Sequence, residues 1–264
     1  MADAGTQTRE RAPWGLAEAI VAWITSTALQ GLLLVGLIGA GDFSTTTPAR
    51  PGGNLGRATG QVVTEQELAD RSVPVAWQLL LLFPGWILLL GVAWVYGGLL
   101  KRDRPGWSLR GEWADIPRGI AAGLVLQIPL VPIVVVLMQL IFGDLEPTGR
   151  ALTLVDSVSS SPFLVVLLVV CVAIGAPLVE ELFYRGLVQP ALIRLTNVPI
   201  GVGLASLIFG AVHLSLVELV PLSVVGLVFG ILAHRTGRLL PSIIAHMTFN
   251  AFTLVALLLA SGSA

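Results

Sequence analysis

The chain has 264 residues and a formal net charge of −1; 55% of its residues are hydrophobic and only 12% are charged. Soluble domains carry about 25% charged residues, so this composition lacks the polar surface that covers a water-soluble domain. A nearly neutral chain without a basic stripe does not favour nucleic-acid binding, and the single cysteine, Cys171, excludes an internal disulfide bond.

Long apolar runs follow one another along most of the chain. About 20 helical residues cross the hydrocarbon core of a bilayer, and no segment alternates with the period of two that barrel strands require. The sequence therefore predicts an all-α fold, a polytopic transmembrane bundle of about seven to eight helices. Seven runs are expected to form them: residues 17–40, 73–100, 116–142, 162–179 with its continuation, 198–217, 219–233 and 239–259. The sixth of these is the shortest.

The polar stretches divide the chain. Residues 1–16 are expected to form a cytoplasmic N-terminal tail without a removable signal peptide, and residues 41–72, rich in Gly, Thr and Pro, an outer loop. Residues 17–159 then hold the N-terminal transmembrane helices. Residues 160–260 hold the remaining helices and every candidate for chemistry.

Basic residues indicate the orientation, because Lys and Arg concentrate in short cytoplasmic loops. Alternating crossings place one set on a single side of the membrane: Arg9, Arg11, Lys101, Arg102, Arg104, Arg110, Arg118, Arg194, Arg235 and Arg238. The sequence thus predicts a multi-pass protein of the cell (plasma) membrane with a cytoplasmic N-terminus.

Three polar clusters interrupt the apolar runs of the second half. An ionisable residue inside a membrane is costly unless it is paired or hydrated, so each cluster is a functional hypothesis. The clusters are Glu180-Glu181 with Arg185, Phe209 with His213, and His246 with Asn250.

In the first cluster, helical geometry separates the two acids. Glu181 and Arg185 are four residues apart on one helix face and can form an ion pair, whereas Glu180 points elsewhere. Glu180 would then face the bundle without its own cation, as suits a general base. The alternative is that both acids cap a helix end at the wet rim of the membrane.

The second cluster can meet the first. A turn near residues 194–199 makes two antiparallel helices, and at 1.5 Å per residue Glu180 and His213 each lie about 24–26 Å from that turn. The two side chains are therefore expected to face each other. This requires one long helix from about Pro162 to Leu195.

In the third cluster, His246 and Asn250 share a helix face and could direct two hydrogen-bond donors at one oxyanion. Alone, such a pair more often joins two transmembrane helices through hydrogen bonds. His234, beside Arg235 at a helix end, is expected to be solvated. Gly226 and Gly230 are expected to allow close helix packing.

Together the three clusters resemble the signature motifs of the CAAX-protease and bacteriocin-processing family (the CPBP or Abi family), which includes the type II CAAX prenyl endopeptidases. The resemblance covers about residues 160–255, and each motif alone would be weak. It implies an intramembrane endopeptidase, a peptide hydrolase of the glutamate type. In this family reading Glu180 is the catalytic glutamate, which activates water together with His213. His246 and Asn250 hold the oxyanion; Glu181, Arg185 and Phe209 support the site.

The resemblance also implies a peptide or membrane-protein substrate, prenylated or not, met in the lipid bilayer, and no nucleic-acid partner. No cofactor is expected. A zinc ion held by Glu180, His213 and His246, with Glu181 as a further candidate ligand, is the alternative, although no His-Glu-x-x-His motif is present. Two other functions are alternatives: a non-catalytic scaffold or immunity protein of the same fold, and a proton-coupled transporter. The transporter is disfavoured because the first half lacks matching ionisable residues.

Overall fold

The computed structural model describes residues 16–40, 74–97, 110–143 and 150–261. Within these ranges the chain forms helices joined by short turns and no strand, which confirms the predicted all-α fold. Outside the described ranges lie residues 1–15 of the predicted tail and the whole predicted outer loop, residues 41–72. The same holds for the basic residues Arg9, Arg11, Lys101, Arg102 and Arg104.

Six helices of the described ranges are long and apolar enough to cross a membrane. They are α1 (Leu16–Ala40), α3 (Val75–Leu80) with α4 (Leu82–Gly97), α5 (Asp115–Val125) continuing to α6 (Val131–Phe142), α8 (Pro162–Leu168) continuing through α9 (Ala176–Phe183) to α10 (Gln189–Leu195), α12 (Leu216–Thr236) and α13 (Leu240–Ser261). Two shorter helices, α7 (Arg150–Val158) and α11 (Val198–Ala211), complete the described elements. The protein is therefore a multi-pass membrane protein, as expected.

The boundary predicted between the fifth and sixth helices was wrong. The expected helices were residues 198–217 and 219–233, but α11 ends at Ala211 and α12 spans Leu216–Thr236. The fifth helix, with 14 residues, is therefore the short one. Hydropathy could not locate this break because apolar residues continue across it. The Ser215 hydroxyl, which accepts a hydrogen bond from the Glu218 amide, marks the true start of α12.

Three π-helical turns widen the long helices: η2 (Leu126–Leu130), η3 (Val169–Gly175) and η4 (Tyr184–Val188). Each lies at or just before a proline of the same helix, namely Pro129, Pro177 and Pro190. Proline has no amide hydrogen and its ring displaces the carbonyl one turn earlier, which accounts for the wider turns. Two of the three fall in the helix that carries Glu180.

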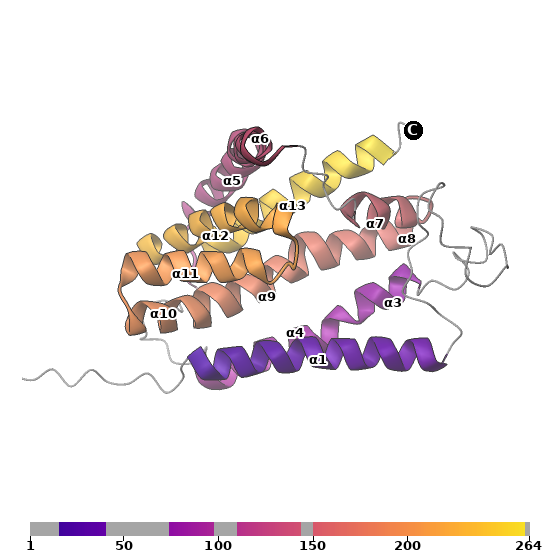
Figure 1. Cartoon of the computed structure of the whole chain (residues 1–264), viewed down its shortest axis with the longest axis horizontal. Helices are drawn as coiled ribbons and strands as arrows, with labels where there is room; N and C mark the ends of the chain where they lie inside the picture. The colour runs from indigo at the N-terminus through magenta and orange to yellow at the C-terminus, as the bar shows by residue number, and fades with distance from the viewer. Residues whose placement is uncertain (1–15, 41–73, 98–109, 144–149, 262–264) are drawn as a thin grey trace, which may run out of the picture.

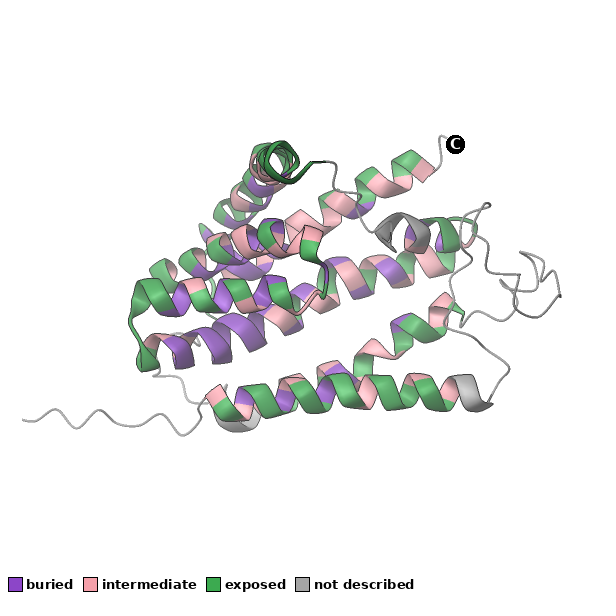
Figure 2. Ribbon diagram, viewed as in Figure 1, coloured by how far each residue is buried: buried purple, intermediate pink, exposed green. Residues whose placement is uncertain are grey.

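This helix, Pro162–Leu195, is continuous as predicted and lies at the centre of the bundle (Figure 1). Residues 181–189 are all buried, and the buried colour is concentrated there in Figure 2. A helix that is buried on every side needs partners all round it. α11, α12, α13, α4 and α1 all contact it.

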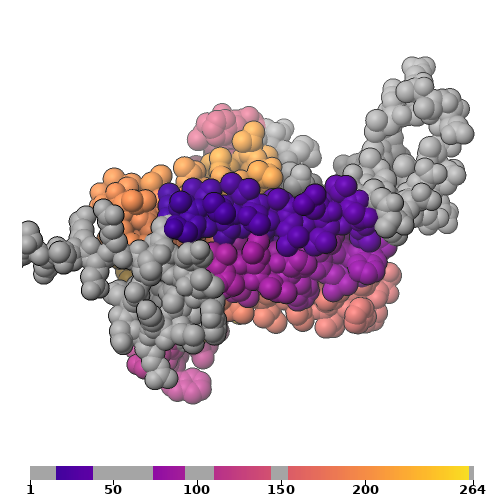
Figure 3. Space-filling view, turned by 90° about the horizontal axis from the view of Figure 1, so that it is seen from below, coloured from indigo at the N-terminus to yellow at the C-terminus, as the bar shows by residue number. Residues whose placement is uncertain are grey.

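Large apolar side chains cover the outside of the bundle. Val21 of α1 is 62% exposed, Ile87 of α4 70% and Leu140 of α6 77%. Such a surface would be unstable in water and fits contact with hydrocarbon. Figure 3 shows one outer face, where α1 lies over the α3–α4 helix. Gly85 of α4 allows this approach, because a Cβ there would overlap the side chains of Ser26 and Gln30.

Candidate active site

The three polar clusters come together from three neighbouring parts of the bundle. The central helix supplies Glu180, Glu181 and Arg185; the end of α11 and the turn after it supply Phe209 and His213; α13 supplies His246 and Asn250. His213 therefore lies just beyond the end of α11, whereas the sequence places it within the predicted helix 198–217. The contacts among these residues decide which of the expected roles the geometry favours.

The predicted ion pair between Glu181 and Arg185 is confirmed. Arg185 Nη1 donates to Glu181 Oε1 at 2.9 Å, and both side chains are almost wholly buried. Arg185 Nη2 also donates to the carbonyl of Gly226 in α12 at 3.1 Å. Gly226 permits this contact, since a Cβ would crowd Arg185 and the Phe209 ring. The pair thus anchors the central helix to α12.

His246 lies between the two glutamates. Its Nδ1 is 3.0 Å from Glu181 Oε1, and its Nε2 is 3.9 Å from Glu180 Oε2. A carboxylate only accepts hydrogen bonds when ionised, so Glu181 fixes the hydrogen on Nδ1 and turns Nε2 toward Glu180. The separation from Glu180 exceeds a direct hydrogen bond.

The two glutamates differ as the helical geometry predicted. The Glu181 side chain is fully buried, whereas that of Glu180 is 28% exposed and makes no ion pair with an Arg or Lys among the described residues. Glu180 is therefore the acid that a reacting molecule can reach. Glu181 orients its neighbours from behind.

His213 occupies the turn between α11 and α12. Its Nδ1 lies 2.8 Å from the carbonyl oxygen of Phe209, an acceptor left unpaired at the helix end. Because a carbonyl can only accept, the hydrogen lies on Nδ1 and leaves Nε2 free to accept a proton. No hydrogen bond or ion pair joins His213 to Glu180 in the described ranges, so any cooperation between them passes through a third group.

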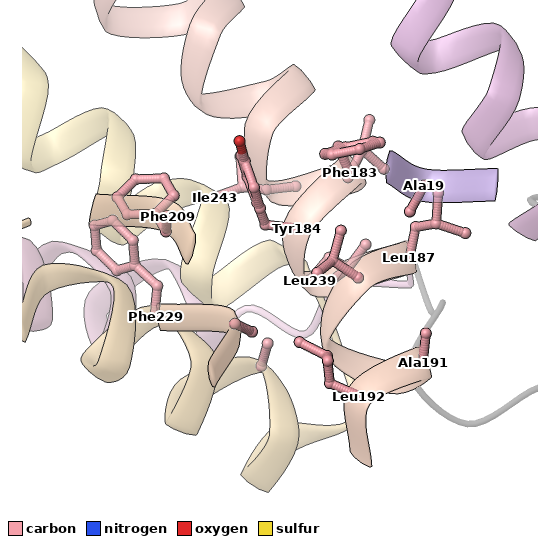
Figure 4. Close-up of a cluster of buried hydrophobic side chains, with 14 of the residues drawn as sticks. Ala19, Phe183, Tyr184, Leu187, Ala191, Leu192, Phe209, Phe229, Leu239 and Ile243 are labelled. Carbon is pink, nitrogen blue, oxygen red and sulfur yellow. The ribbon is translucent and has the colours of Figure 1, made fainter. Parts of the chain in front are cut away.

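Two phenylalanines hold the imidazoles in place. The Phe209 ring lies 5.4 Å from the His213 ring and 5.7 Å from the His246 ring, both edge to face. Phe229 of α12 stacks on His246 at 4.8 Å and 28° (Figure 4 shows Phe209 beside Phe229). Arg185 sits over the Phe209 ring at 4.4 Å. The sequence did not indicate Phe229, because an aromatic residue in an apolar helix usually packs in the core without a role in a site.

Asn250 is held by the backbone of the central helix. Its Nδ2 donates to the carbonyl of Val172 at 2.9 Å, within the π-turn η3. An amide carries two N–H hydrogens, so one remains for another acceptor. The prediction that Asn250 shares a site with His246 is thus compatible with this contact. The sequence gave no sign of the Val172 partner, since a π-turn carbonyl is invisible in residue type.

One further residue of the central helix repeats the Arg185 contact one turn later. Gln189 is buried, and its Nε2 donates to the carbonyl of Gly230 at 3.0 Å. Gly226 and Gly230 therefore do allow close packing, and both expose carbonyls to the central helix. His234, as expected, is exposed at the end of α12.

The arrangement suits hydrolysis. The reachable Glu180 carboxylate lies 3.9 Å from His246 Nε2, and the Phe209 ring packs against both His246 and the second imidazole, His213. The described ranges contain no group of three His, Cys, Asp or Glu side chains placed to hold a metal ion, so the geometry gives the zinc alternative no specific support.

Comparisons with known proteins point the same way. Residues 162–252 match the family described as "Type II CAAX prenyl endopeptidase Rce1-like". The chain is also 29% identical over 115 residues to the "Putative membrane peptidase YdiL" of Bacillus subtilis (strain 168); the match covers 44% of this chain and 46% of that protein. The chain thus spans about half the length of this relative. No solved structure matches. Residues 162–252 of the chain are thus similar to the Rce1-like family of type II CAAX prenyl endopeptidases.

Proposed function

We propose that the protein is an intramembrane endopeptidase in which Glu180 is the general base that activates water. The observation that carries the proposal is the asymmetry of the two glutamates: Glu181 is buried and paired with Arg185 and His246, while Glu180 is reachable and faces His246 Nε2. The family of residues 162–252 supports a protease.

The other residues take roles that their contacts allow. His213, with Nδ1 committed to the Phe209 carbonyl, offers Nε2 to the attacking water or its proton. His246 and Asn250 stabilise the oxyanion that forms at the scissile carbonyl. For His246 this requires a hydrogen on Nε2, the ring nitrogen that faces Glu180.

Glu181, Arg185 and Phe209 position the reacting groups. Arg185 holds the Glu181 carboxylate, which orients His246, and the Phe209 carbonyl and ring orient His213. None of the three needs to touch the substrate.

The substrate is a peptide or a membrane protein that reaches the site in the lipid bilayer, with or without a prenyl group. We place the protein in the plasma membrane with a cytoplasmic N-terminus, on the basis of the basic residues between spans. The C-terminal ends of α10 and α12, which carry Arg194 and Arg235, lie at the same end of the molecule (Figure 1). A cysteine introduced before α1 that could be labelled only from the outside of intact cells would contradict this orientation.

The test uses the protein purified in detergent and a mixture of proteome-derived peptides, with new termini identified by mass spectrometry. Glu180→Gln removes the base and keeps the shape, so turnover should fall by about 10²–10⁴-fold, the usual contribution of a general base. Asp156→Asn, a change in an exposed acid of α7, should leave turnover unchanged. Equal turnover by wild type and by Glu180→Gln would end the proposed mechanism.

The same assay separates the metal-free mechanism from the zinc alternative. The metal-free mechanism predicts full activity in a strong chelator. If activity is lost in the chelator and restored by zinc alone, Glu180, His213 and His246 become ligands of a metal site. A properly folded wild type that cleaves none of the peptides would instead favour the non-catalytic scaffold.

A further inference from the structure

An apolar cavity of about 230 Å³ lies where α1, the central helix and α11 meet. α1 supplies four of its lining residues, including Ala19, Ile20 and Trp23. Only apolar surface lines it, and it is open on one side. Ile20 is 49% exposed, so this opening adjoins the lipid-facing surface of α1. In Figure 3 the indigo atoms of α1 meet the orange atoms of the α11 region at one end of the molecule.

The cavity adjoins the candidate active site through two of its walls. Tyr184, one helical turn after Glu180, lines it. Val212, the residue before His213, lines it from the other side. The Tyr184 ring also packs edge to face on Phe209 at 5.4 Å. Figure 4 shows Tyr184 standing between Phe209 and the pair Phe183 and Ala19.

Size and chemistry limit what the cavity can hold. An apolar protein cavity of about 150 Å³ stays free of water and binds benzene. A cavity of about 230 Å³ therefore has room for one large aliphatic or aromatic side chain, and its apolar walls reject a polar one. A group bound there would contact Tyr184 and Val212, which lie close in the chain to Glu180 and His213.

We propose that this cavity is a subsite for a large apolar side chain of the substrate peptide, next to the bond that is cleaved. The proposal rests on the proposed peptidase function. It assigns α1 a share in substrate selection, although α1 lies outside residues 162–252, which match the family and carry the chemistry. Helix α1, which carries none of the proposed catalytic residues, would then set which substrate side chains the protein prefers.

Two variants of α1 test the subsite in opposite directions. Ala19 is 1% exposed and lines the cavity, so Ala19→Phe should fill it; Ile20→Ala should enlarge it. Val21→Phe adds the same ring to a side chain that is 62% exposed and does not line the cavity, and serves as the matched control.

Cleavage of the peptide mixture gives the first measurement. One position beside the cleaved bond should favour Leu, Met and aromatic residues over Ala. Ala19→Phe should reduce that preference about tenfold or more, because one methylene group in a hydrophobic pocket already changes discrimination by about this factor. Ile20→Ala should shift the preference toward larger residues. Val21→Phe should match wild type. Unchanged preferences in folded Ala19→Phe and Ile20→Ala proteins would overturn the proposal.

A second measurement does not depend on turnover. A pool of synthetic peptides, each carrying one photoreactive diazirine analogue of leucine, is irradiated with the Glu180→Gln protein in lipid nanodiscs. Cross-links should map to residues 16–23 of α1 and 208–212, and should be lost in the Ala19→Phe/Glu180→Gln protein. Labelling of these residues by a diazirine-bearing phospholipid but not by the peptides would assign the cavity to lipid and overturn the subsite. If wild type cleaves nothing yet these peptide cross-links form, the peptidase function fails and the binding site stands.

Discussion

At the scale of single residues, the buried carboxylate of Glu181 depends on its hydrogen-bond and ion-pair partners. Its Oε1 accepts from Arg185 and lies within hydrogen-bond distance of His246, whereas Oε2 is buried without a hydrogen-bond partner in the described ranges. A charge removed from water is stable only while its partner is present. We therefore expect Arg185 to be required mainly for folding, and only through folding for the geometry of the site.

This dependence predicts the effect of removing the guanidinium. Arg185→Met should lower the free energy of unfolding by about 3–5 kcal/mol, because an unpaired carboxylate stays buried. The double variant Arg185→Met/Glu181→Gln should recover part of the loss, since a neutral amide needs no counter-charge and can still contact His246. Unfolding in detergent micelles, followed by helical circular dichroism, measures both.

The matched control is Arg194→Met, which removes an exposed arginine from the end of the same helix. It should change the free energy of unfolding little, as exposed charges contribute little. If the single and double variants lose equal stability, Arg185 does not stabilise the protein by neutralising the buried charge of Glu181.

At the scale of elements, the α11–α12 hairpin sets the position of His213. The two helices pack closely because Gly210, three residues before His213, has no side chain; a Cβ there would overlap the backbone carbonyl of Leu219 and the Ser223 side chain. Gly203, in the same helix, faces open space. The two glycines therefore have different roles in one helix.

The difference gives a matched pair of variants. Gly210→Ala should force α11 and α12 apart, cost about 1–3 kcal/mol as overpacked sites do, and reduce turnover by displacing His213. Gly203→Ala should leave turnover unchanged and should stabilise the protein by about 0.5–1 kcal/mol, because alanine is a better helix former than glycine. Unfolding and peptide cleavage are measured on the same preparations. A Gly210→Ala protein as stable and active as wild type would show that the contact with Leu219 does not hold the hairpin.

The same hairpin shows how far the sequence could be read. Apolar run length predicted the helices, polar residues and Pro199 predicted the turn near residues 194–199, and spacing by four predicted the pair of Glu181 with Arg185. Neither could place the end of α11, because Val212, Leu214 and Leu216 continue the apolar run through the turn. Leu214 adopts a left-handed backbone (φ 54°) that no sequence rule assigns to leucine.

Contacts between distant segments were also beyond the sequence. The stacking of Phe229 on His246, the Val172 carbonyl behind Asn250 and the cavity wall from α1 all depend on how helices far apart in the chain pack. Residue type identified the polar groups of the site because polar groups are rare in this chain. It could not identify apolar or backbone partners, which every helix supplies in excess.

At the scale of the whole molecule, α5 adds two links between the N-terminal helices and residues 162–252, beyond the contacts of α1 and α4 with the central helix. α5 packs along α13, where Gly119 and Gly123 bring it against the backbone of Pro241 and Ala245. Near the ends of these helices, Arg238 binds Asp115 with two hydrogen bonds, of 2.8 and 2.7 Å. Because Asp115 accepts these bonds, the pKa of Arg238 is raised above its ordinary value, so the charge is permanent.

Arg238 is therefore expected to fix where α13 begins, and through it the height of His246. It also donates to Glu112 at 2.9 Å, while Arg118, 53% exposed, reaches Asp115 only at 3.5 Å. Arg238→Met should lower the midpoint of thermal unfolding clearly more than Arg118→Met, because it leaves the fully buried Asp115 with the weaker partner alone. Arg238→Lys should restore the charge without the two-pronged contact, and so recover only part of the loss.

The effect on turnover decides whether this link acts on the site or only on stability. Measured well below the unfolding midpoint, Arg238→Met should cleave peptides more slowly than wild type, since a shift of α13 moves His246 and Asn250 relative to Glu180. Arg118→Met, on the same carboxylate, should cleave at the wild-type rate. Wild-type turnover by a less stable Arg238→Met protein would show that the helices before residue 160 support the fold without setting the geometry of catalysis. The selection of apolar side chains by α1 would then be their one contribution to function.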